Sequence, residues 1–406
     1  MNGFNEDITL EGHIIDSQIL SKVWGAVMDL GGEYEVREMR IGRSKGETSF
    51  ARMTISAASA AHLHRILTAL QDYGAELVSR DDAQTEPAPH AGALPDDFYS
   101  TTNLPTQIRW NGAWIDVSDT EMDLAIVVDR ARGTARMIPM ADVRAGDAVV
   151  VGHDGIRVLP LQRARDRETF SFMASEVSSE KPKRLVIEEI AKQMRETRER
   201  GGKILVVAGP AIVHSGAGPF LARMIRAGFV QVLFGGNAIA THDVESALLG
   251  TSLGVALHNG EAMEGGHRHH MVAINAIRRA GSLRAAVAQG ILREGIMYEC
   301  IQNQVELVLA GSIRDDGPLP DVITDTQQAQ RQMRAALAGV EMALMVSTML
   351  HSIATGNMLA ASVKVAVVDI NPAVVTKLAD RGTFQALGLV TDAELFMREL
   401  AEALRV

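Results

Sequence analysis

The segment from residue 230 to residue 245 combines residue types that could do chemistry with a spacing that would position them. Its apolar, β-branched run over residues 230–234 ends at Gly235 and Gly236. Glycine has no Cβ, so the backbone can bend sharply there and approach a ligand closely. The pattern predicts a strand–loop–helix corner, where open parallel sheets bind nucleotides or small acids.

We expect Thr241 to cap the helix that follows this loop. Asp243 and Glu245 would then lie in its first turn, where the partial positive charge of the helix N-terminus favours acidic side chains. The helix would therefore begin with a polar turn beside the glycine loop.

Two further loops come directly after apolar runs. Residues 209–218 resemble a phosphate-binding loop, but Leu221 stands where a third glycine is expected, and the loop has no Walker lysine. A tight turn is the alternative. In residues 311–316, Asp316 could accept hydrogen bonds from a ribose or a substrate amine, with an ordinary solvated turn as the alternative.

An acidic residue also ends the apolar run of residues 365–369. Nucleotide-binding folds hold ribose hydroxyls with an acid at such a position, and Pro372 suits the first turn of the next helix. Asp369 is therefore predicted to bind a nucleotide, although capping of that helix is an alternative role.

A basic cluster follows the glycine pair at residues 265–266. His267, His269 and His270 have neither the i,i+3 nor the i,i+4 spacing that zinc ligands on one helix usually show. We expect no metal here, and predict that the cluster, with Arg268, recognises a carboxylate or phosphate. The single cysteine, Cys300, is expected to be a small buried apolar side chain.

Composition excludes several classes of protein. A chain of 406 residues predicts two or three domains. The net charge of −10 disfavours a nucleic-acid partner, and no apolar run is long enough to span a membrane. One cysteine and an acidic, polar N-terminus suit a reducing cytoplasm and no signal peptide.

Three regions follow from the order of the predicted elements. Residues 1–80 contain a β-α-β-β-α-β pattern typical of a ferredoxin-like unit. Residues 79–105, with four prolines, are predicted to be a linker, and residues 106–162 a small β domain. In residues 185–406, apolar strands alternate with helices, which predicts a parallel sheet in a Rossmann-like α/β domain. The strands are expected at residues 204–208, 230–234, 253–257, 305–310, 343–346 and 365–369.

Several segments together resemble the family that shares a conserved region with lysine-oxoglutarate reductase/saccharopine dehydrogenase. Its characterised branch is the archaeal-type ornithine cyclodeaminase, also found as the C-terminal part of the cyanobacterial arginine dihydrolases. The matching segments are residues 209–214, 235–245, 267–270, 350–358 and 368–382.

This resemblance implies a C-terminal domain with the NAD-binding fold seen in deoxyhypusine synthase, and NAD as a tightly held cofactor. On the matching positions, the residues that would touch NAD are Asn237, Ala238, Asp316, Thr348, Met349, Leu350, His351, Asp369 and Asp392. For Asp392 there is an alternative, since Thr391 and Asp392 are also typical of the start of a helix.

The resemblance also implies a reaction. Hydride would leave the α-carbon of ornithine for NAD, the δ-amine would attack the resulting imine, ammonia would leave, and returned hydride would give proline without net redox change. His267, Arg268 and His269 are candidates for the substrate carboxylate. His242 and Asp243 are candidates for proton transfer, and Asp316 could instead hold the substrate ammonium.

Two other functions stay open on the sequence alone. One is an NAD-dependent dehydrogenase or lyase acting on another amino acid, and the other is a regulatory binding protein that senses an amino acid through its ferredoxin-like unit. The apolar segment of residues 340–362 favours a homo-oligomer.

Overall fold

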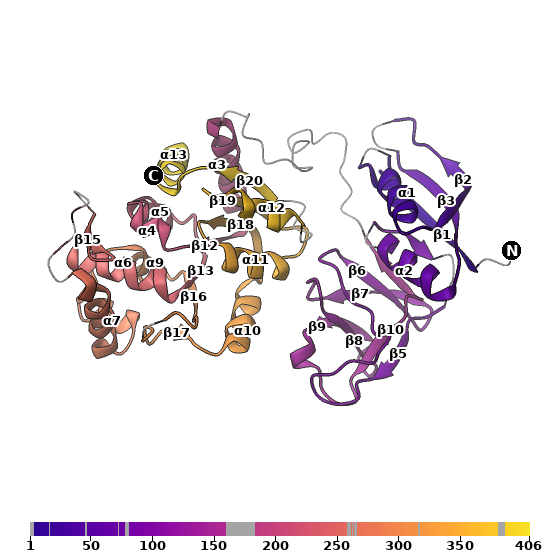
Figure 1. The fold of residues 1–406 in the computed structure, drawn as a ribbon, viewed down its shortest axis with the longest axis horizontal. Coiled ribbons are helices and arrows are strands. Elements are labelled where there is room, and N and C mark those ends of the chain that lie inside the picture. The colour runs from indigo at the N-terminus through magenta and orange to yellow at the C-terminus, as the bar shows by residue number, and fades with distance from the viewer. Residues whose placement is uncertain are drawn as a thin grey trace. The chain divides into compact units, whose positions relative to one another are not determined.

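The structure is a computed structural model whose described residues form two compact units (Figure 1). The N-terminal unit comprises residues 1–171 with 357–362, and the C-terminal unit comprises residues 172–356 with 363–406. The residues that the structure describes are 4–15, 17–44, 47–71, 73–77, 81–159, 183–257, 261, 263, 266–315, 317–380 and 386–406.

The first part of the N-terminal unit is an antiparallel sheet with strand order β2-β3-β1-β4 and two helices. This order, with apolar residues of both helices buried against the sheet, is the ferredoxin-like arrangement expected from the sequence. The elements are β1 (Phe4–Gly12), α1 (Ile19–Asp29), β2 (Glu33–Arg40), β3 (Ser49–Ala57), α2 (Ala60–Gln71) and β4 (Glu76–Leu77).

The second part of this unit is a seven-stranded sheet of order β11-β6-β7-β9-β8-β10-β5. Its strands are β5 (Gln84–Pro87), β6 (Thr106–Trp110), β7 (Ala113–Ser118), β8 (Ala125–Asp129), β9 (Thr134–Ile138), β10 (Ala148–Val151) and β11 (Ile156–Val158), with the short helix η1 (Met140–Asp142) before β10.

The predicted linker at residues 79–105 is wrong for its described part. Strand β5 pairs with β10, and Tyr99 is buried in the core of the β region. The prolines suggested a linker because proline has no N–H to donate to a neighbouring strand. Pro87 is tolerated in β5 because β5 is an edge strand, which pairs with a neighbour on one side only.

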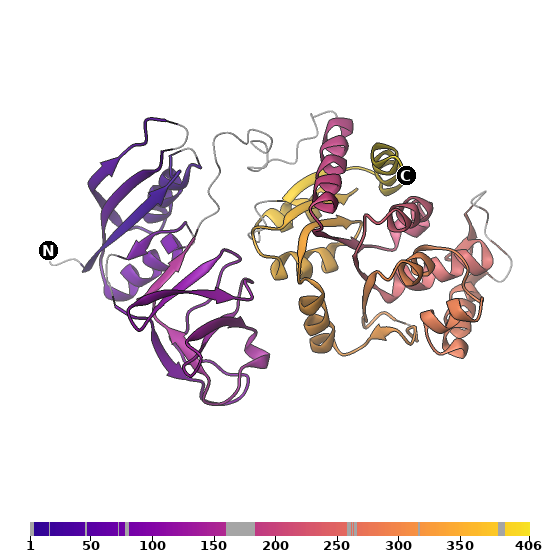
Figure 2. The ribbon, with the colours of Figure 1, turned by 180° about the vertical axis from the view of Figure 1, so that it is seen from behind.

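The C-terminal unit is built on a parallel sheet of order β17-β16-β13-β12-β18-β19-β20. Helices cover both of its faces (Figure 1 and Figure 2). Its strands are β12 (Lys203–Ala208), β13 (Val232–Gly236), β16 (Glu306–Ala310), β17 (Val322–Ile323), β18 (Val340–Val346), β19 (Lys364–Asp369) and β20 (Ala386–Val390). The helices are α3 (Lys183–Glu199), α4 (Ala211–His214), α5 (Gly218–Arg226), α6 (Asn237–Leu249), η3 (Gly266–Arg268), α7 (His269–Ala280), α8 (Leu283–Ala288), α9 (Ile296–Gln302), α10 (Thr326–Ala336), α11 (Met349–Met358), α12 (Pro372–Asp380) and α13 (Ala393–Leu404).

The middle of this sheet is the core of the unit. Residues 204–208 of β12 and 343–346 of β18 are fully buried, so these strands are continuous apolar runs without alternation. The Rossmann-like prediction is therefore confirmed. The apolarity of residues 340–346, part of the reason for predicting a homo-oligomer, is accounted for by this burial, and the oligomer stays a prediction.

Two local predictions were wrong. Residues 253–257 do not join the parallel sheet, because Leu253 and Gly254 turn the chain with φ of 52° and 71°. They connect β14 (Thr251–Ser252) to β15 (Val255–Ala256) as an antiparallel hairpin. Helix α6 begins at Asn237, so Thr241 lies inside it and does not cap it.

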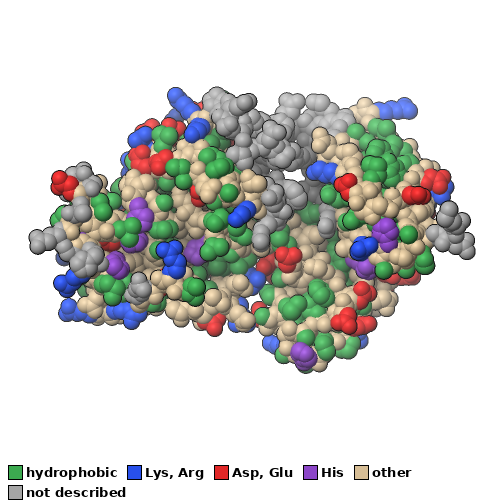
Figure 3. All heavy atoms as spheres, in the orientation of Figure 1, with side chains coloured by type: hydrophobic (Ala, Val, Ile, Leu, Met, Phe, Trp, Pro, Cys, Tyr) green, Lys and Arg blue, Asp and Glu red, His purple; other side chains and the backbone are tan. Residues whose placement is uncertain are grey.

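No helix among the described residues is long and apolar enough to cross a membrane. On the face shown in Figure 3, acidic and basic side chains are interspersed over each unit.

We predict that Gly209→Ala destabilises the C-terminal unit by about 1–3 kcal/mol, the usual cost of overpacking a well-packed site. A Cβ on Gly209 would lie 1.8 Å from the carbonyl oxygen of Ser347. Thermal and urea unfolding would measure the effect. Gly218→Ala is the matched control, because its Cβ would meet only Ile296 at 3.9 Å. Equal stability of the two variants would contradict the prediction.

Candidate functional site

The centre of the parallel sheet contains a point at which the strand order reverses. Strands β12 and β18 are neighbours although about 130 residues separate them, and β13 and β19 flank them on either side. In sheets of this order the loops after the two strands at the reversal, here β12 and β18, leave in opposite directions and bound a crevice at the carboxyl edge. This crevice is where α/β sheets of this order bind their ligands.

Backbone segments approach one another closely at this edge. The amide of Gly209 donates to the carbonyl oxygen of Val346 at 2.9 Å, and Ser347 adopts a left-handed conformation with φ of 53°. The ring of His351 lies over the end of β13, since a Cβ on Gly236 would be 3.0 Å from its Cε1 atom. Burial lowers the pKa of His351, so its neutral form is favoured.

The predicted cofactor residues of α11 lie at its start, after the loop that follows β18. Thr348 is half-buried, whereas Met349 and Leu350 are exposed. These three residues follow β18, whereas Asn237 follows β13 on the other side of the point where the strand order reverses.

Asp369 ends β19, next to β18 in the sheet, and is 9% exposed. One of its carboxylate oxygens, Oδ1, accepts from the amide of Asn371 at 2.8 Å. The structure thus places this acid at the carboxyl edge with one oxygen bonded to its own loop.

Three other predicted cofactor residues differ in their surroundings. The Asn237 side chain is buried, and its Oδ1 accepts from the Leu319 amide at 3.0 Å and from the Thr241 hydroxyl at 3.2 Å. Ala238 is exposed beside it. Asp392 caps α13, accepting from the amides of Glu394 and Leu395 at 2.8 and 3.1 Å.

Three histidines form a cluster beside the crevice, on segments that follow β12 and β13. His242 of α6 is buried, and its Nδ1 is 3.0 Å from Oε2 of Glu245. The His214 ring, at the end of α4, packs edge-on against the His242 ring with centroids 4.7 Å apart. His269, at the start of α7, joins the cluster through Thr251, whose hydroxyl oxygen is 2.8 Å from its Nδ1.

Glu245 is the buried anion of this cluster, with 0% exposure. Burial opposes its ionisation, but hydrogen bonds from His242, the Gly254 amide and Thr251 outweigh burial and lower the pKa of this carboxyl. The Gly254 and Thr251 bonds measure 2.8 and 2.9 Å, and the Leu253 amide donates at 3.2 Å. Glu245 is therefore a charged side chain that accepts hydrogen bonds from four donors.

Asp243, predicted for proton transfer, points into a different environment. Its two carboxylate oxygens accept from the amides of Ile296 and Met297 at 2.8 and 2.7 Å, at the N-terminus of α9. Burial raises its pKa to about 6 against the opposing effect of these amides. Both oxygens are thus engaged by the helix.

The basic cluster of the sequence is only partly described. Arg268 is exposed and ends η3, and His269 belongs to the histidine cluster. The side chain of His267 and the whole of Asp316 lie outside the described residues. Cys300 is buried in the core of the unit, as expected, and burial raises its pKa.

Sequence reasoning assigned no catalytic or binding role to four members of the cluster. They are His214, Glu245, Thr251 and Ser252, the last with its hydroxyl 2.6 Å from the Nδ1 of His214. The i,i+3 spacing of His242 and Glu245 on one helix was a signal for the central pair. The hairpin partners gave no such signal.

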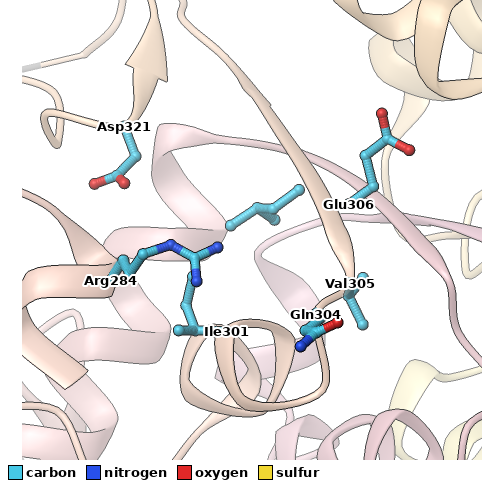
Figure 4. Close-up of a pocket in the computed structure, with 7 residues that line it drawn as sticks. Arg284, Ile301, Gln304, Val305, Glu306 and Asp321 are labelled. Atoms are coloured by element: carbon cyan, nitrogen blue, oxygen red, sulfur yellow. The ribbon is translucent and has the colours of Figure 1, made fainter. Parts of the chain in front are cut away.

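A surface cavity of about 590 Å³ lies elsewhere, around the starts of β16 and β17 (Figure 4). Arg284 and Asp321 face it, and Figure 4 shows the carboxylate of Glu306 directed away from them. None of the predicted site residues lines it. The carboxyl edge, which carries Asp369 on one side of the switch point and the histidine cluster on the other, is therefore the candidate site.

Three family models match successive parts of the chain. Residues 5–104 match the LOR/SDH bifunctional enzyme conserved region. Residues 105–187 match the first region, and residues 188–400 the Rossmann-fold region, of the C-terminal part of ArgZ-like arginine dihydrolases.

Proteins named ornithine cyclodeaminase are similar over nearly their full length. The one from Methanocaldococcus jannaschii is 54% identical, and the match covers 99% of this chain and 96% of that protein. The bifunctional arginine dihydrolase/ornithine cyclodeaminase AgrE of Nostoc sp. is 46% identical, with 98% of this chain matching 58% of it.

Solved structures agree with these sequence matches. The apo structure of ArgZ, an arginine dihydrolase of cyanobacteria, has a TM-score of 0.87 and 40% identity, covering 100% of this chain and 59% of that chain. The complex of AgrE with ornithine and NAD+ has a TM-score of 0.54 and 44% identity, covering 99% and 58%. The chain therefore belongs to the LOR/SDH conserved-region family that includes the archaeal ornithine cyclodeaminases and the C-terminal part of the cyanobacterial arginine dihydrolases.

Proposed function

We propose that this protein is an NAD-dependent ornithine cyclodeaminase that converts L-ornithine to L-proline and ammonia. The observation that carries the proposal is a buried His242–Glu245 pair beside the switch-point crevice of a Rossmann sheet. Support comes from the full-length relatives of that name and from AgrE, whose structure contains ornithine and NAD+.

The residues at the carboxyl edge fit NAD. Asp369 offers a largely buried carboxylate at a strand end, suited to ribose hydroxyls. Gly209 and Gly236 let the segments at this edge pack closely, because a Cβ on Gly209 would meet the Ser347 carbonyl and a Cβ on Gly236 would meet the His351 ring. The Ser215 hydroxyl, at the C-terminal end of α4, is buried and has no hydrogen-bond partner among the described residues. When bound, NAD would supply a group that takes up a hydride and gives it back within one turnover.

The protein's own side chains would then bind the amino acid and move protons. The sequence suggested His267, Arg268 and His269 for the substrate carboxylate. We keep Arg268 and His267 in that role, and assign His269, whose Nδ1 is 2.8 Å from the Thr251 hydroxyl oxygen, to proton transfer instead. His242 is proposed to take a proton from the α-ammonium group, because Glu245 stabilises the imidazolium that results. The contacts of Asp243 favour a structural role at α9 over the proton transfer first predicted for it.

Ornithine is expected to yield equal amounts of proline and ammonia with a catalytic quantity of NAD and no accumulating NADH. Because a hydride would leave and return within one active site, deuterium placed at Cα of ornithine should be kept in proline. Mass spectrometry of the product, with absorbance at the NADH band, measures both. Stoichiometric NADH from another amino acid would favour a dehydrogenase. Binding of an amino acid without turnover would favour a regulatory sensor.

Asp369→Ala is predicted to weaken NAD binding at least tenfold, roughly 1.4 kcal/mol. The reason is loss of the carboxylate that would accept from the ribose hydroxyls. Calorimetry would measure it, with Asp392→Ala as the matched acid. Because Asp392 caps α13, we expect Asp392→Ala to keep NAD affinity, in contrast to the role that the family resemblance implied, and to lose about 1 kcal/mol of stability with the cap. Unchanged affinity in folded Asp369→Ala would remove this residue from the site.

His242→Gln and Asp243→Asn change neighbouring residues, but the first is predicted to affect the rate of turnover and the second the stability of the fold. His242→Gln should slow turnover by about 10²–10⁴, the usual weight of a general acid–base group, while NAD stays bound. Asp243→Asn should cost about 1–3 kcal/mol of stability, because its amide nitrogen would face a backbone N–H. Rate assays and urea unfolding distinguish the two variants.

The pH dependence of stability gives a second check on Asp243. Its raised pKa means that the folded protein binds this proton more tightly than the unfolded chain does. The group's contribution is therefore present at low pH and is lost as pH rises from about 4 to about 6. The stability difference between the wild-type protein and Asp243→Asn should shrink over that range. A difference that grows would contradict the assignment.

A further inference from the structure

We propose that Glu245 is a positioning residue that sets the tautomers of His242 and His269 together, so that both rings carry their proton on Nδ1 and keep Nε2 unprotonated. Its catalytic meaning rests on the proposed function, but the tautomers themselves do not.

The tautomer of His242 follows from its direct contact with Glu245. An ionised carboxylate can only accept hydrogen bonds, so the His242 Nδ1 atom at 3.0 Å must be the donor. The neutral ring therefore has its lone pair on Nε2. Glu245 stays ionised because His242, Thr251, Leu253 and Gly254 all donate to it.

The tautomer of His269 follows through one intermediate hydroxyl. Thr251 has a single hydroxyl proton, and it donates this proton to Oε1 of Glu245 at 2.9 Å. Its oxygen can then only accept from the His269 Nδ1 atom at 2.8 Å. His269 must therefore carry a proton on Nδ1, as His242 does.

The hairpin after α6 holds this arrangement in place. Leu253 and Gly254 form its turn with positive φ at both positions, which directs both amides to Glu245. The turn also packs against the start of η3, since a Cβ on Gly254 would lie 2.3 Å from the carbonyl carbon of Gly266. The hairpin thus links the helix of His242 to the helix of His269.

His214 provides a contrast within the same cluster. Its Nδ1 is 2.6 Å from the Ser252 hydroxyl, which can either donate or accept. Neither group contacts Glu245 through a hydrogen bond that the structure describes. Its tautomer is therefore independent of Glu245.

Two neutral imidazoles match the proton count of the proposed reaction. Ornithine enters with two ammonium groups, and both amines must lose a proton, the α-amine before oxidation and the δ-amine before ring closure. Ammonia leaves as ammonium, and the proline nitrogen takes up a proton, so both protons return and none is gained or lost overall. One base for each ammonium group would meet this requirement.

The test is nitrogen NMR of the full chain with labelled histidine, at about pH 8, above the usual imidazole pKa of about 6.5. His242→Gln and His269→Gln assign the signals. Both rings should show a protonated Nδ1 and an unprotonated Nε2. Thr251→Val should change the tautomer of His269 alone. Glu245→Gln should change the tautomer of at least one of the two rings, because its amide keeps one acceptor oxygen and replaces the other with a donor. His214 should be unaffected by Thr251→Val.

Glu299→Gln is the matched control, since Glu299 is a buried glutamate of the same unit that pairs with Arg226, away from the histidines. It should leave both tautomers and the rate unchanged, whereas Glu245→Gln should lower kcat by at least about 10²-fold. A protonated Nε2 on either ring of the wild-type protein would overturn the proposal, and so would a Thr251→Val variant with unaltered His269. Thr251→Val still tests the proposal if Glu245→Gln does not fold. Correct tautomers without ornithine turnover would refute the proposed function alone.

Discussion

The parallel pairing of β12 with β18 at the centre of the sheet is the constraint on which the rest of the C-terminal unit depends. It brings Gly209 against Ser347, so that a single Cβ would collide with a backbone oxygen. It also makes the loops on its two sides diverge, and the crevice between them is a consequence of strand order. Asp369 and His351 reach this crevice from one side, and His242 and His214 lie beside it on the other.

A buried charge is the second organising element. A carboxylate with no exposure is costly unless its hydrogen-bonding capacity is used, and Glu245 receives bonds from α6 and from the hairpin after it. Leu253 adopts an uncommon positive φ within this hairpin, and its amide donates to the carboxylate. The bonds that stabilise the buried carboxylate also orient His242 directly and His269 through Thr251. The same interactions therefore stabilise the fold and position the side chains proposed for proton transfer.

Acidic residues in this unit therefore serve different purposes although they look alike in the sequence. Asp243 accepts from backbone amides at the N-terminus of α9 through both of its oxygens, and Asp392 caps α13 through Oδ1. Asp369 ends β19, the neighbour of β18, and Glu245 lies on α6 beside the crevice. The distinction lies in which backbone amides come within reach of each carboxylate.

The sequence alone determined the class of the fold and the edge of the sheet that carries the site. Continuous apolar runs separated by helical segments predict a parallel sheet, and glycines or acids after those runs mark its carboxyl edge, because these are local properties of the chain. Only the tertiary structure decided which polar side chains meet. His214, Thr251 and His269 are up to 55 residues apart in the chain, and a hairpin whose turn the residue pattern did not indicate joins them. Hydrogen bonds between such segments depend on ångström-level positions that packing sets, and residue spacing does not encode them.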